Sequence, residues 1–282
     1  MKTNVLLKNY TTFKIGGPAK YFKQVDTIEE MQETLHFANK KKIPFHILGR
    51  GSNSLFDDKG YNGLVILNKI NTYTQDSNRF TVGAGFSFAY LGVKSARKGY
   101  GGLEFASGIP ASVGGAIFMN AGANGKETRD HLEEVLFVTK EGKLISYKKQ
   151  DLEFSYRSSS FQKMEGAIVS AIFSLQEMTN AREHQLEIVN YRRVTQPYNE
   201  PSIGCIFRNP QNGSAGQLIE ESQLKGESVG GALISSIHAN FIVNSANAKS
   251  EDVKQLIKLI QTKIKCDRGI DLESEIRIIP YV

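Results

Sequence analysis

Residues 103–122, LEFASGIPASVGGAIFMNAG, constrain the fold of this chain most, because small residues dominate the segment and only single aliphatic residues interrupt them. Gly108, Gly114, Gly115 and Gly122 lie in it. Glycine has no Cβ, so the main chain can take a positive φ and come within hydrogen-bonding distance of a ligand. We therefore interpret the segment as main chain that lies against a bound molecule.

A second glycine-containing stretch, ILGRGSNSL at residues 47–55, follows a short apolar run and predicts a loop of free N–H donors after a strand. Two donor loops indicate one long anionic ligand, although isolated glycines also mark ordinary tight turns. The loop lacks the third glycine of GxGxxG, and the chain contains no GxxxxGK[ST]. The sequence therefore argues against a Rossmann or P-loop nucleotide site.

The length of 282 residues allows two or three compact domains with a sizeable buried core. No apolar run approaches the length of a membrane span, and residues 1–13 have too short an apolar stretch for a signal peptide. We therefore expect a cytoplasmic protein without a membrane partner.

The net charge of +6 comes from lysines and arginines scattered in short groups, without a basic stripe interleaved with aromatic residues. This distribution suits a small anionic substrate and argues against nucleic acid as a partner. The two cysteines, Cys205 and Cys266, have no CxxC or CxxH spacing. We expect free thiols in a reducing compartment and no metal site.

Hydrophobic periodicity predicts helices and strands in the first half of the chain. Thr27 and Glu30 have capping-box spacing at the start of a helix from Ile28 to about Lys41. The other expected elements are strands at 45–48, 64–67, 80–82 and 168–175, a helix at 88–98, and a hairpin at 134–139 and 144–147. Residues 71–79 and 176–182 predict linkers between domains.

In the second half, a helix at 183–193 precedes an extended loop that Pro197 and Pro201 impose. We expect a helix from Ala215 to about Leu224, a strand at 241–244, and a helix that Ser250 caps and that runs to about Lys265. Residues 272–280 predict a last strand with alternating polar and apolar side chains. The elements together indicate a mixed α+β protein.

Six motifs occur in an order that one enzyme family shares. They are TTFKIGGPA at 11–19, GRGSN at 49–53, SGIPASVGGAIFMNAGA at 107–123, SYRSSSF at 155–161, GCIFRNP at 204–210 and LESEIRII at 272–279. Over residues 10–279 the chain thereby resembles the UDP-N-acetylenolpyruvoylglucosamine reductase (MurB) family of flavoenzymes. The interval from Phe161 to Glu183 is too short for the tyrosine-bearing substrate loop of one subgroup, so the chain is similar to the shorter subgroup.

The resemblance implies an α+β fold whose FAD-binding part is of the vanillyl-alcohol-oxidase type, with two α+β subdomains and a separate α/β substrate-binding domain. The first subdomain would comprise residues 1–68 together with the C-terminal strand 270–282. The second subdomain would comprise residues 69–180, and the substrate-binding domain residues 183–269.

The resemblance also implies FAD, held without a covalent bond because residues 49–53 and 107–123 contain no histidine or cysteine. The main-chain donors of these segments would take the pyrophosphate, and their small side chains would leave room for the isoalloxazine ring. The implied FAD contacts are Gly49, Arg50, Gly51, Ser52, Asn53, Ser107, Gly108, Ile109, Pro110, Ala111, Val113, Gly114, Gly115, Ala116, Asn120 and Gly122.

The implied reaction is the reduction of UDP-N-acetylglucosamine enolpyruvate to UDP-N-acetylmuramate in peptidoglycan precursor synthesis. NADPH would reduce the flavin, and the reduced flavin would give a hydride to the β-carbon of the substrate alkene. The UDP-sugar enolpyruvyl ether is the partner that the resemblance implies, and we expect the protein to be a monomer.

Three side chains match the family's catalytic positions. Arg157 would pair with the substrate carboxylate, Glu275 with a raised pKa would hydrogen-bond the developing enolate, and Cys205 would deliver the proton, where the family often has serine. Arg193 and Asn209 match positions that hold the substrate's phosphates or uridine. Without the resemblance, the three would be a surface ion pair, a solvated strand residue and a buried small side chain.

Two other functions stay open from the sequence. A flavin oxidoreductase of the same fold would oxidise a 2-hydroxy acid or an alcohol and would need a base. A flavin- or nucleotide-binding regulatory protein would have no turnover. The trio of Arg157, Cys205 and Glu275 suits protonation of a carbanion better than oxidation.

Overall fold

The computed structural model describes residues 1–211 and 213–281, and the chain divides into two compact units. The first unit comprises Met1, Phe22–Arg50 and Gly63–Arg192. The second comprises Lys2–Tyr21, Gly51–Asn62 and Arg193–Val282. The three-part division expected from the sequence stays a prediction.

The first unit contains a five-stranded antiparallel sheet with the strand order β12-β11-β15-β7-β6. Its strands are β6 (Tyr73–Asp76), β7 (Arg79–Gly83), β11 (Leu132–Thr139), β12 (Leu144–Lys148) and β15 (Gly166–Ser174). The expected strand at 80–82, the hairpin and the strand at 168–175 are therefore confirmed. The expected linker at 71–79 is wrong in part, because Tyr73–Asp76 pairs with β7 as a hairpin strand.

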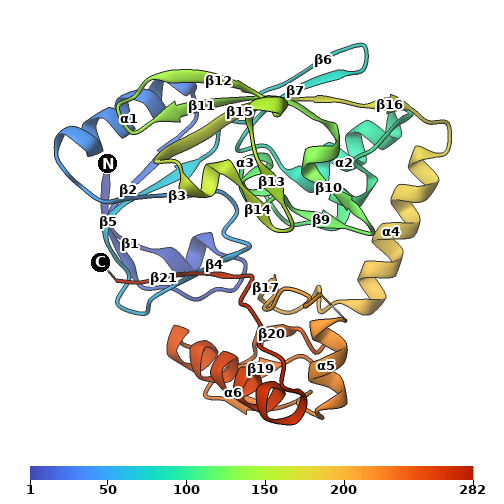
Figure 1. The fold of residues 1–282 in the computed structure, drawn as a ribbon. Coiled ribbons are helices and arrows are strands. Elements are labelled where there is room, and N and C mark those ends of the chain that lie inside the picture. Colours follow the sequence, from blue (N-terminus) through green and yellow to red (C-terminus); the bar gives the residue numbers. More distant parts are fainter. Residues whose placement is uncertain (212, 282) are drawn as a thin grey trace. The chain divides into compact units, whose positions relative to one another are not determined.

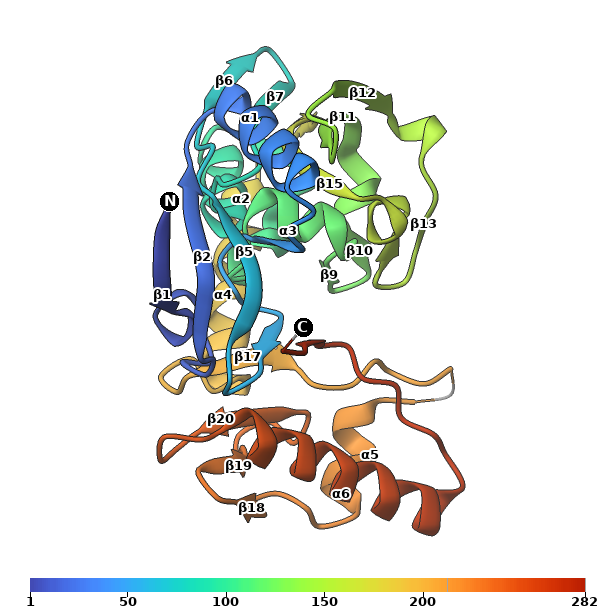
Figure 2. The same ribbon diagram turned by 90° about the vertical axis from the view of Figure 1, so that its left-hand side faces the viewer.

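Helix α1 (Ile28–Lys40) begins as its capping signal predicts, since the Thr27 hydroxyl accepts a hydrogen bond from the Glu30 N–H at 3.2 Å. It lies against β11 and β15 (Figure 1 and Figure 2). The Gln32 amide donates to the Gly142 carbonyl at 2.9 Å, which ties the helix to the β11–β12 turn. The expected strands at 45–48 and 64–67 are β3 (Phe45–Leu48) and part of β5 (Tyr61–Asn68), and they pair in parallel.

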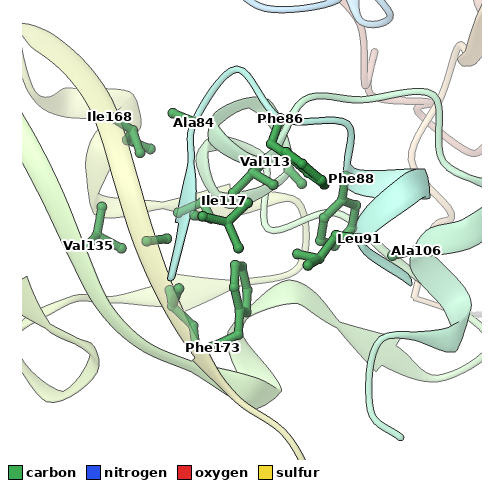
Figure 3. Close-up of a cluster of buried hydrophobic side chains, with 14 of the residues drawn as sticks. Ala84, Phe86, Phe88, Leu91, Ala106, Val113, Ile117, Val135, Ile168 and Phe173 are labelled. Atoms are coloured by element: carbon green, nitrogen blue, oxygen red, sulfur yellow. The ribbon is translucent and has the colours of Figure 1, made fainter. Parts of the chain in front are cut away.

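Helix α3 (Val113–Phe118) lies inside the glycine-rich segment, where the sequence predicted no helix. It packs Val113 and Ile117 into the apolar core of the first unit, where Phe86, Phe88 and Phe173 surround them (Figure 3). The other helices are α2 (Phe88–Arg97) and α4 (Ala181–Thr195), and the last three residues of α4 belong to the second unit. The short strands of this unit are β8 (Tyr100–Gly101), β9 (Gly122–Ala123), β10 (Lys126–Glu127), β13 (Phe154–Ser155), β14 (Ser158–Ser159) and β16 (Gln176–Glu177). The core thus fixes one side of the segment that the sequence singled out.

The second unit contains a four-stranded antiparallel sheet with the order β17-β20-β19-β18, against which α6 packs. Its elements are β17 (Ser202–Cys205), α5 (Ala215–Glu221), β18 (Ser228–Val229), β19 (Ala232–Ile234), β20 (Phe241–Asn244) and α6 (Ser250–Arg268). Strand β4 (Ser54–Phe56) pairs in parallel with the C-terminal strand β21 (Arg277–Ile279). Near the N-terminus lie β1 (Lys2–Leu6) and β2 (Pro18–Val25).

Four expectations about boundaries differ from the structure. The last strand covers only 277–279, because the Glu275 N–H donates to the Ile206 carbonyl at 2.7 Å and residues 273–275 run beside 206–208. Ser250 is the first residue of α6 and not its cap, and its hydroxyl donates to the Asp58 carboxylate. Helix α5 ends at Glu221, and the expected linker at 176–182 contains β16 and the start of α4.

Across the described ranges 1–211 and 213–281, no helix combines the length and the apolar character that a membrane span requires.

Candidate active site

The loop at residues 49–53 follows β3, and in the first unit it approaches the glycine-rich segment closely. A Cβ added to Gly49 would lie 2.2 Å from Ser112 Oγ and 3.3 Å from Ser112 Cβ. Glycine is required here by this close approach. The first unit therefore brings Gly49 together with the segment 107–122, as two parts of one predicted ligand site.

Gly51 shows a different constraint, which the second unit imposes. Its φ is +63°, and an added Cβ would lie 2.4 Å from the Tyr10 carbonyl oxygen and 2.7 Å from Thr11 Cα. The Gly51 carbonyl accepts a hydrogen bond from the Thr12 N–H at 3.3 Å. The motif at 11–19 thus supports this half of the loop, which explains why the two motifs accompany each other.

The main-chain N–H groups of residues 49–53 make no hydrogen bond to another residue in the part of the chain that the structure describes. Oriented main-chain donors in a turn form a favourable surface for an anion. The sequence-based expectation of a donor loop at this position therefore agrees with the geometry.

The segment 107–122 differs, because the protein's own carbonyl groups already accept from most of its N–H groups. The Val113 N–H donates to the Phe86 carbonyl at 2.9 Å, and the Gly114 N–H to the Ala84 carbonyl at 2.8 Å. The Ser112 hydroxyl accepts from the Gly115 N–H at 3.3 Å and caps α3. These residues stay predicted FAD contacts, and the N–H groups of Val113, Gly114 and Gly115 already have partners within the protein.

Further N–H groups of this segment are used in the same way. The Ile109 N–H donates to the Ala106 carbonyl, the Ala111 N–H to the Ile109 carbonyl and the Ala116 N–H to the Ser112 carbonyl, and Pro110 has no N–H. Ser107 is different, because its hydroxyl oxygen is buried and has no hydrogen-bond partner among the described residues. This hydroxyl packs against α2, because a Cβ added to Gly92 would lie 2.9 Å from it.

Asn120 organises the end of the segment. Its side chain is fully buried, its amide donates to the Ser155 carbonyl at 2.9 Å and to the Glu127 carboxylate at 3.0 Å, and its amide oxygen accepts from the Arg129 N–H. The Arg129 guanidinium pairs with Glu127 at 2.8 Å and donates to the Phe154 carbonyl. This network holds the main chain immediately before the turn that carries Arg157.

Arg157 occupies the turn between β13 and β14 with a φ of +57°, a conformation that an arginine rarely adopts. Its guanidinium donates to the Gly122 carbonyl at 3.0 Å and lies 4.7 Å from the centre of the Tyr156 ring. The first unit therefore brings the predicted carboxylate-binding side chain to the end of the predicted FAD segment. A strained turn that the surrounding hydrogen bonds hold in place is typical of a functional position.

The second unit brings together the main chains that carry Cys205 and Glu275. The Glu275 N–H donates to the Ile206 carbonyl at 2.7 Å, and the Arg208 N–H donates to the Glu273 carbonyl at 2.9 Å. The Asn53 amide donates to the Glu275 carbonyl at 3.2 Å. Asn53, from the donor loop, thus positions the main chain of the predicted acid. A meeting of these two residues with Arg157 stays a prediction.

The segment that carries Cys205 is held by one buried amide. Asn240 is 3% exposed, and its side chain accepts from the Phe207 N–H at 2.9 Å and donates to the Phe207 carbonyl at 2.8 Å. Its own carbonyl accepts from the Ile206 N–H. In the last strand, partial burial lowers the pKa of the Arg277 guanidinium.

The two predicted substrate-binding residues lie in the second unit. Arg193 is exposed on α4. The Asn209 amide oxygen accepts from the Ala215 N–H at 3.0 Å, at the first residue of α5. This bond orients the side chain of Asn209.

Sequence reasoning missed Asn240, Glu127 and Arg129. For Asn240 a signal existed, because it is a single amide directly before the apolar residues 241–243 of a predicted strand, where a buried polar side chain needs hydrogen-bond partners. Glu127 and Arg129 gave no signal, because charged residues two positions apart in a polar stretch usually lie on the surface.

Comparison with known proteins identifies the family of this chain. The family model for the C-terminal domain of UDP-N-acetylenolpyruvoylglucosamine reductase matches residues 196–279, and the model for an FAD binding domain matches residues 19–148. The reductase of that name from Protochlamydia amoebophila is 58% identical over 281 residues, which are 99% of this chain and 94% of that protein. The one from Chlamydia pneumoniae is 50% identical over 283 residues, with 100% and 92% covered.

A solved structure agrees with these matches. The crystal structure of UDP-N-acetylenolpyruvylglucosamine reductase (MurB) from Thermus caldophilus superposes with a TM-score of 0.84 at 37% identity and covers 98% of each chain. The expected α+β fold with an FAD-binding domain is confirmed. The chain belongs to the UDP-N-acetylenolpyruvoylglucosamine reductase family.

Proposed function

We propose that this protein is an NADPH-dependent FAD enzyme that reduces UDP-N-acetylglucosamine enolpyruvate to UDP-N-acetylmuramate for peptidoglycan synthesis. The observation that carries the proposal is the 58% identity to a reductase of this name over 99% of the chain. The enzyme acts in the cytoplasm as a monomer, and its partners are small molecules rather than nucleic acid or membrane.

The residues of the first unit fit FAD. Gly49 and the segment 107–122 present a cradle of small side chains, and the N–H groups of Gly49 and Arg50 donate to no other described residue. The predicted FAD contacts in these two segments would hold the cofactor without a covalent bond. Bound FAD would supply hydride-transfer chemistry between NADPH and the β-carbon of the substrate alkene.

Hydride addition leaves a negative charge on the α-carbon, which the adjacent carboxylate delocalises. Arg157 pairs with that carboxylate, because a guanidinium matches a carboxylate in charge and shape. A protonated Glu275 donates a hydrogen bond to the developing enolate. The Cys205 thiol then gives its proton to the α-carbon, which completes the saturated lactyl ether, and the thiolate regains a proton from solvent.

Two spectra test this function. The purified protein should show the visible absorption of bound oxidised flavin, and NADPH should bleach it under anaerobic conditions in a stopped-flow instrument. Addition of the UDP-enolpyruvyl sugar should restore the oxidised spectrum. Bleaching by a hydroxy acid with recovery by oxygen would identify an oxidase instead, and a colourless protein would contradict the proposal.

The proton-donor assignment has its own test. Cys205→Ala should leave flavin reduction by NADPH unchanged and slow the reoxidation by substrate about 100-fold or more, as expected for loss of a positioned proton donor. Cys205→Ser should keep substantial activity, because a hydroxyl can deliver the same proton. Equal loss in both half-reactions of Cys205→Ala would argue against the assignment.

A further inference from the structure

An arginine side chain lies directly on the main chain of the predicted FAD segment. If Gly108 carried a Cβ, that atom would lie 2.3 Å from Arg192 Cδ and 2.4 Å from Arg192 Nε. Arg192 comes from the C-terminal part of α4, and both residues belong to the first unit. The absence of a side chain at position 108 is what lets the base of the guanidinium reach this main chain.

The segment itself offers no positive charge. Residues 103–122 contain no lysine or arginine, and their one charged residue, Glu104, is buried and accepts from the Gly102 N–H at 2.7 Å. Many of the N–H groups of the segment donate to the protein's own carbonyls. An anionic group on this surface therefore needs a cation from another part of the chain, and Arg192 is an arginine that packs against it.

A guanidinium binds phosphate with charge-assisted hydrogen bonds, and its planar group of donors matches the phosphate oxygens. The side chain of Arg192 lies beside the main chain of Gly108. A phosphate group next to Gly108 would therefore lie within reach of this guanidinium.

We propose that Arg192 is a cofactor-binding residue whose guanidinium pairs with the diphosphate of FAD beside Gly108. This inference rests on the proposed function. It divides the adjacent arginines between two ligands, with Arg192 on the cofactor and Arg193 on the substrate. It also gives Gly108 a specific role, since any side chain there would displace the guanidinium.

The matched pair Arg192→Ala and Arg193→Ala tests the proposal, because each variant removes one positive charge from the same turn of α4. Dilution of the holoenzyme, with the released flavin followed by its fluorescence, gives the dissociation constant for FAD. Arg192→Ala should raise this constant about 10- to 100-fold, and Arg193→Ala should leave it within about twofold. Arg192→Lys, which keeps the charge, should recover part of the loss.

Salt separates an electrostatic contact from general damage to the fold. The dissociation constant of the unmodified enzyme should rise as sodium chloride screens the arginine, and that of Arg192→Ala should rise less steeply. Circular dichroism at saturating FAD should be the same for both proteins. An unchanged dissociation constant in Arg192→Ala, or an equal salt dependence, would overturn the proposal.

Gly108→Ala provides an independent variant. The new methyl group meets the flexible end of Arg192, so the fold should tolerate it while the guanidinium moves away. FAD binding should weaken about as much as in Arg192→Ala, and the double variant should bind no more than about twofold weaker than Arg192→Ala alone. Fully additive losses would contradict the proposal. A yellow unmodified protein with these negative results would refute only this inference, whereas a colourless one would refute the proposed function.

Discussion

The loop at 49–53 and the segment at 107–122 have similar compositions but use their glycines differently. In the loop, no N–H group donates to another described residue, and Gly51 takes a left-handed φ against the main chain of residues 10–11. In the segment, the N–H groups donate to carbonyls at Ala84, Phe86 and Ser112. In the loop at 49–53, the glycines therefore accompany N–H groups that donate to no described residue. In the segment at 107–122, they allow close packing of the main chain.

This difference teaches that a glycine-rich sequence allows the main chain to approach another part of the molecule closely. Which groups the main chain then hydrogen-bonds depends on the surrounding fold. The loop can contribute donors to an anion, and the segment contributes space and, through Asn120, the support of the Arg157 turn. Substitutions in the two regions should therefore have different costs.

The largest effect is expected for Gly51→Ala, which should lower the free energy of unfolding by about 3 kcal/mol. The left-handed φ strains an alanine, and the new Cβ would collide with Tyr10 and Thr11 main-chain atoms that cannot move independently. Urea denaturation measures the loss. Gly125→Ala is the control, because Gly125 also has a positive φ, but nothing lies within 4 Å of its added Cβ. Similar losses at both positions would show that the loop does not approach residues 10–11 closely.

A smaller loss, about 2 kcal/mol, should follow Asn120→Ala, which leaves the Ser155 carbonyl and the Arg129 N–H without their partners. Asn124→Ala is matched, because Asn124 also has a positive φ but is exposed. Thermal unfolding compares the two variants. If Asn124→Ala were the more destabilising one, the network around Asn120 would not support the segment.

Gly49→Ala should cost about 1.5 kcal/mol, because its Cβ would overlap the Ser112 hydroxyl that caps α3. Combining it with Ser112→Ala removes the overlapping atom, so the two losses should be less than additive by about 1 kcal/mol. A double-mutant cycle in urea measures this coupling. Strict additivity would separate the loop from the segment and break the comparison.

The smallest effect, about 1 kcal/mol, is expected for Asn53→Ala, which removes the hydrogen bond to the Glu275 carbonyl. Asn53→Asp keeps the size of the side chain but replaces the donor by an acceptor, so it should be at least as destabilising. Equilibrium unfolding of the three proteins decides this order. A stable Asn53→Asp would show that the amide does not hold the C-terminal segment.

Local signals in the sequence were enough for elements that their own residues stabilise. The start of α1 follows from Thr27 and Glu30, and β3 and β20 follow from short apolar runs. Helix α3 could not be predicted, because two of its six residues are glycines of low helix propensity and it forms only with the Ser112 cap and burial of Val113 and Ile117. Tertiary contacts likewise redirect residues 272–276 along the Cys205 segment.

The motifs yield predictions of which residues belong to the site, but they do not show which hydrogen bonds each residue makes. The N–H groups of Val113 and Gly114 donate to the carbonyls of Phe86 and Ala84, which lie far away in the sequence. The contact of Arg192 with Gly108 depends on the course of α4. Such pairings arise from the path of the chain in three dimensions, so no spacing in the sequence reveals them.

The hydrogen bonds of Asn240 have a consequence for the evolution of the predicted proton donor, Cys205. This amide binds the N–H and the carbonyl of Phe207 and touches no side-chain atom of Cys205 through these bonds. Asn240 therefore fixes the peptide backbone after position 205 through bonds that do not involve the side chain at that position. If Cys205 is the proton donor, a single substitution to serine would leave these backbone bonds in place.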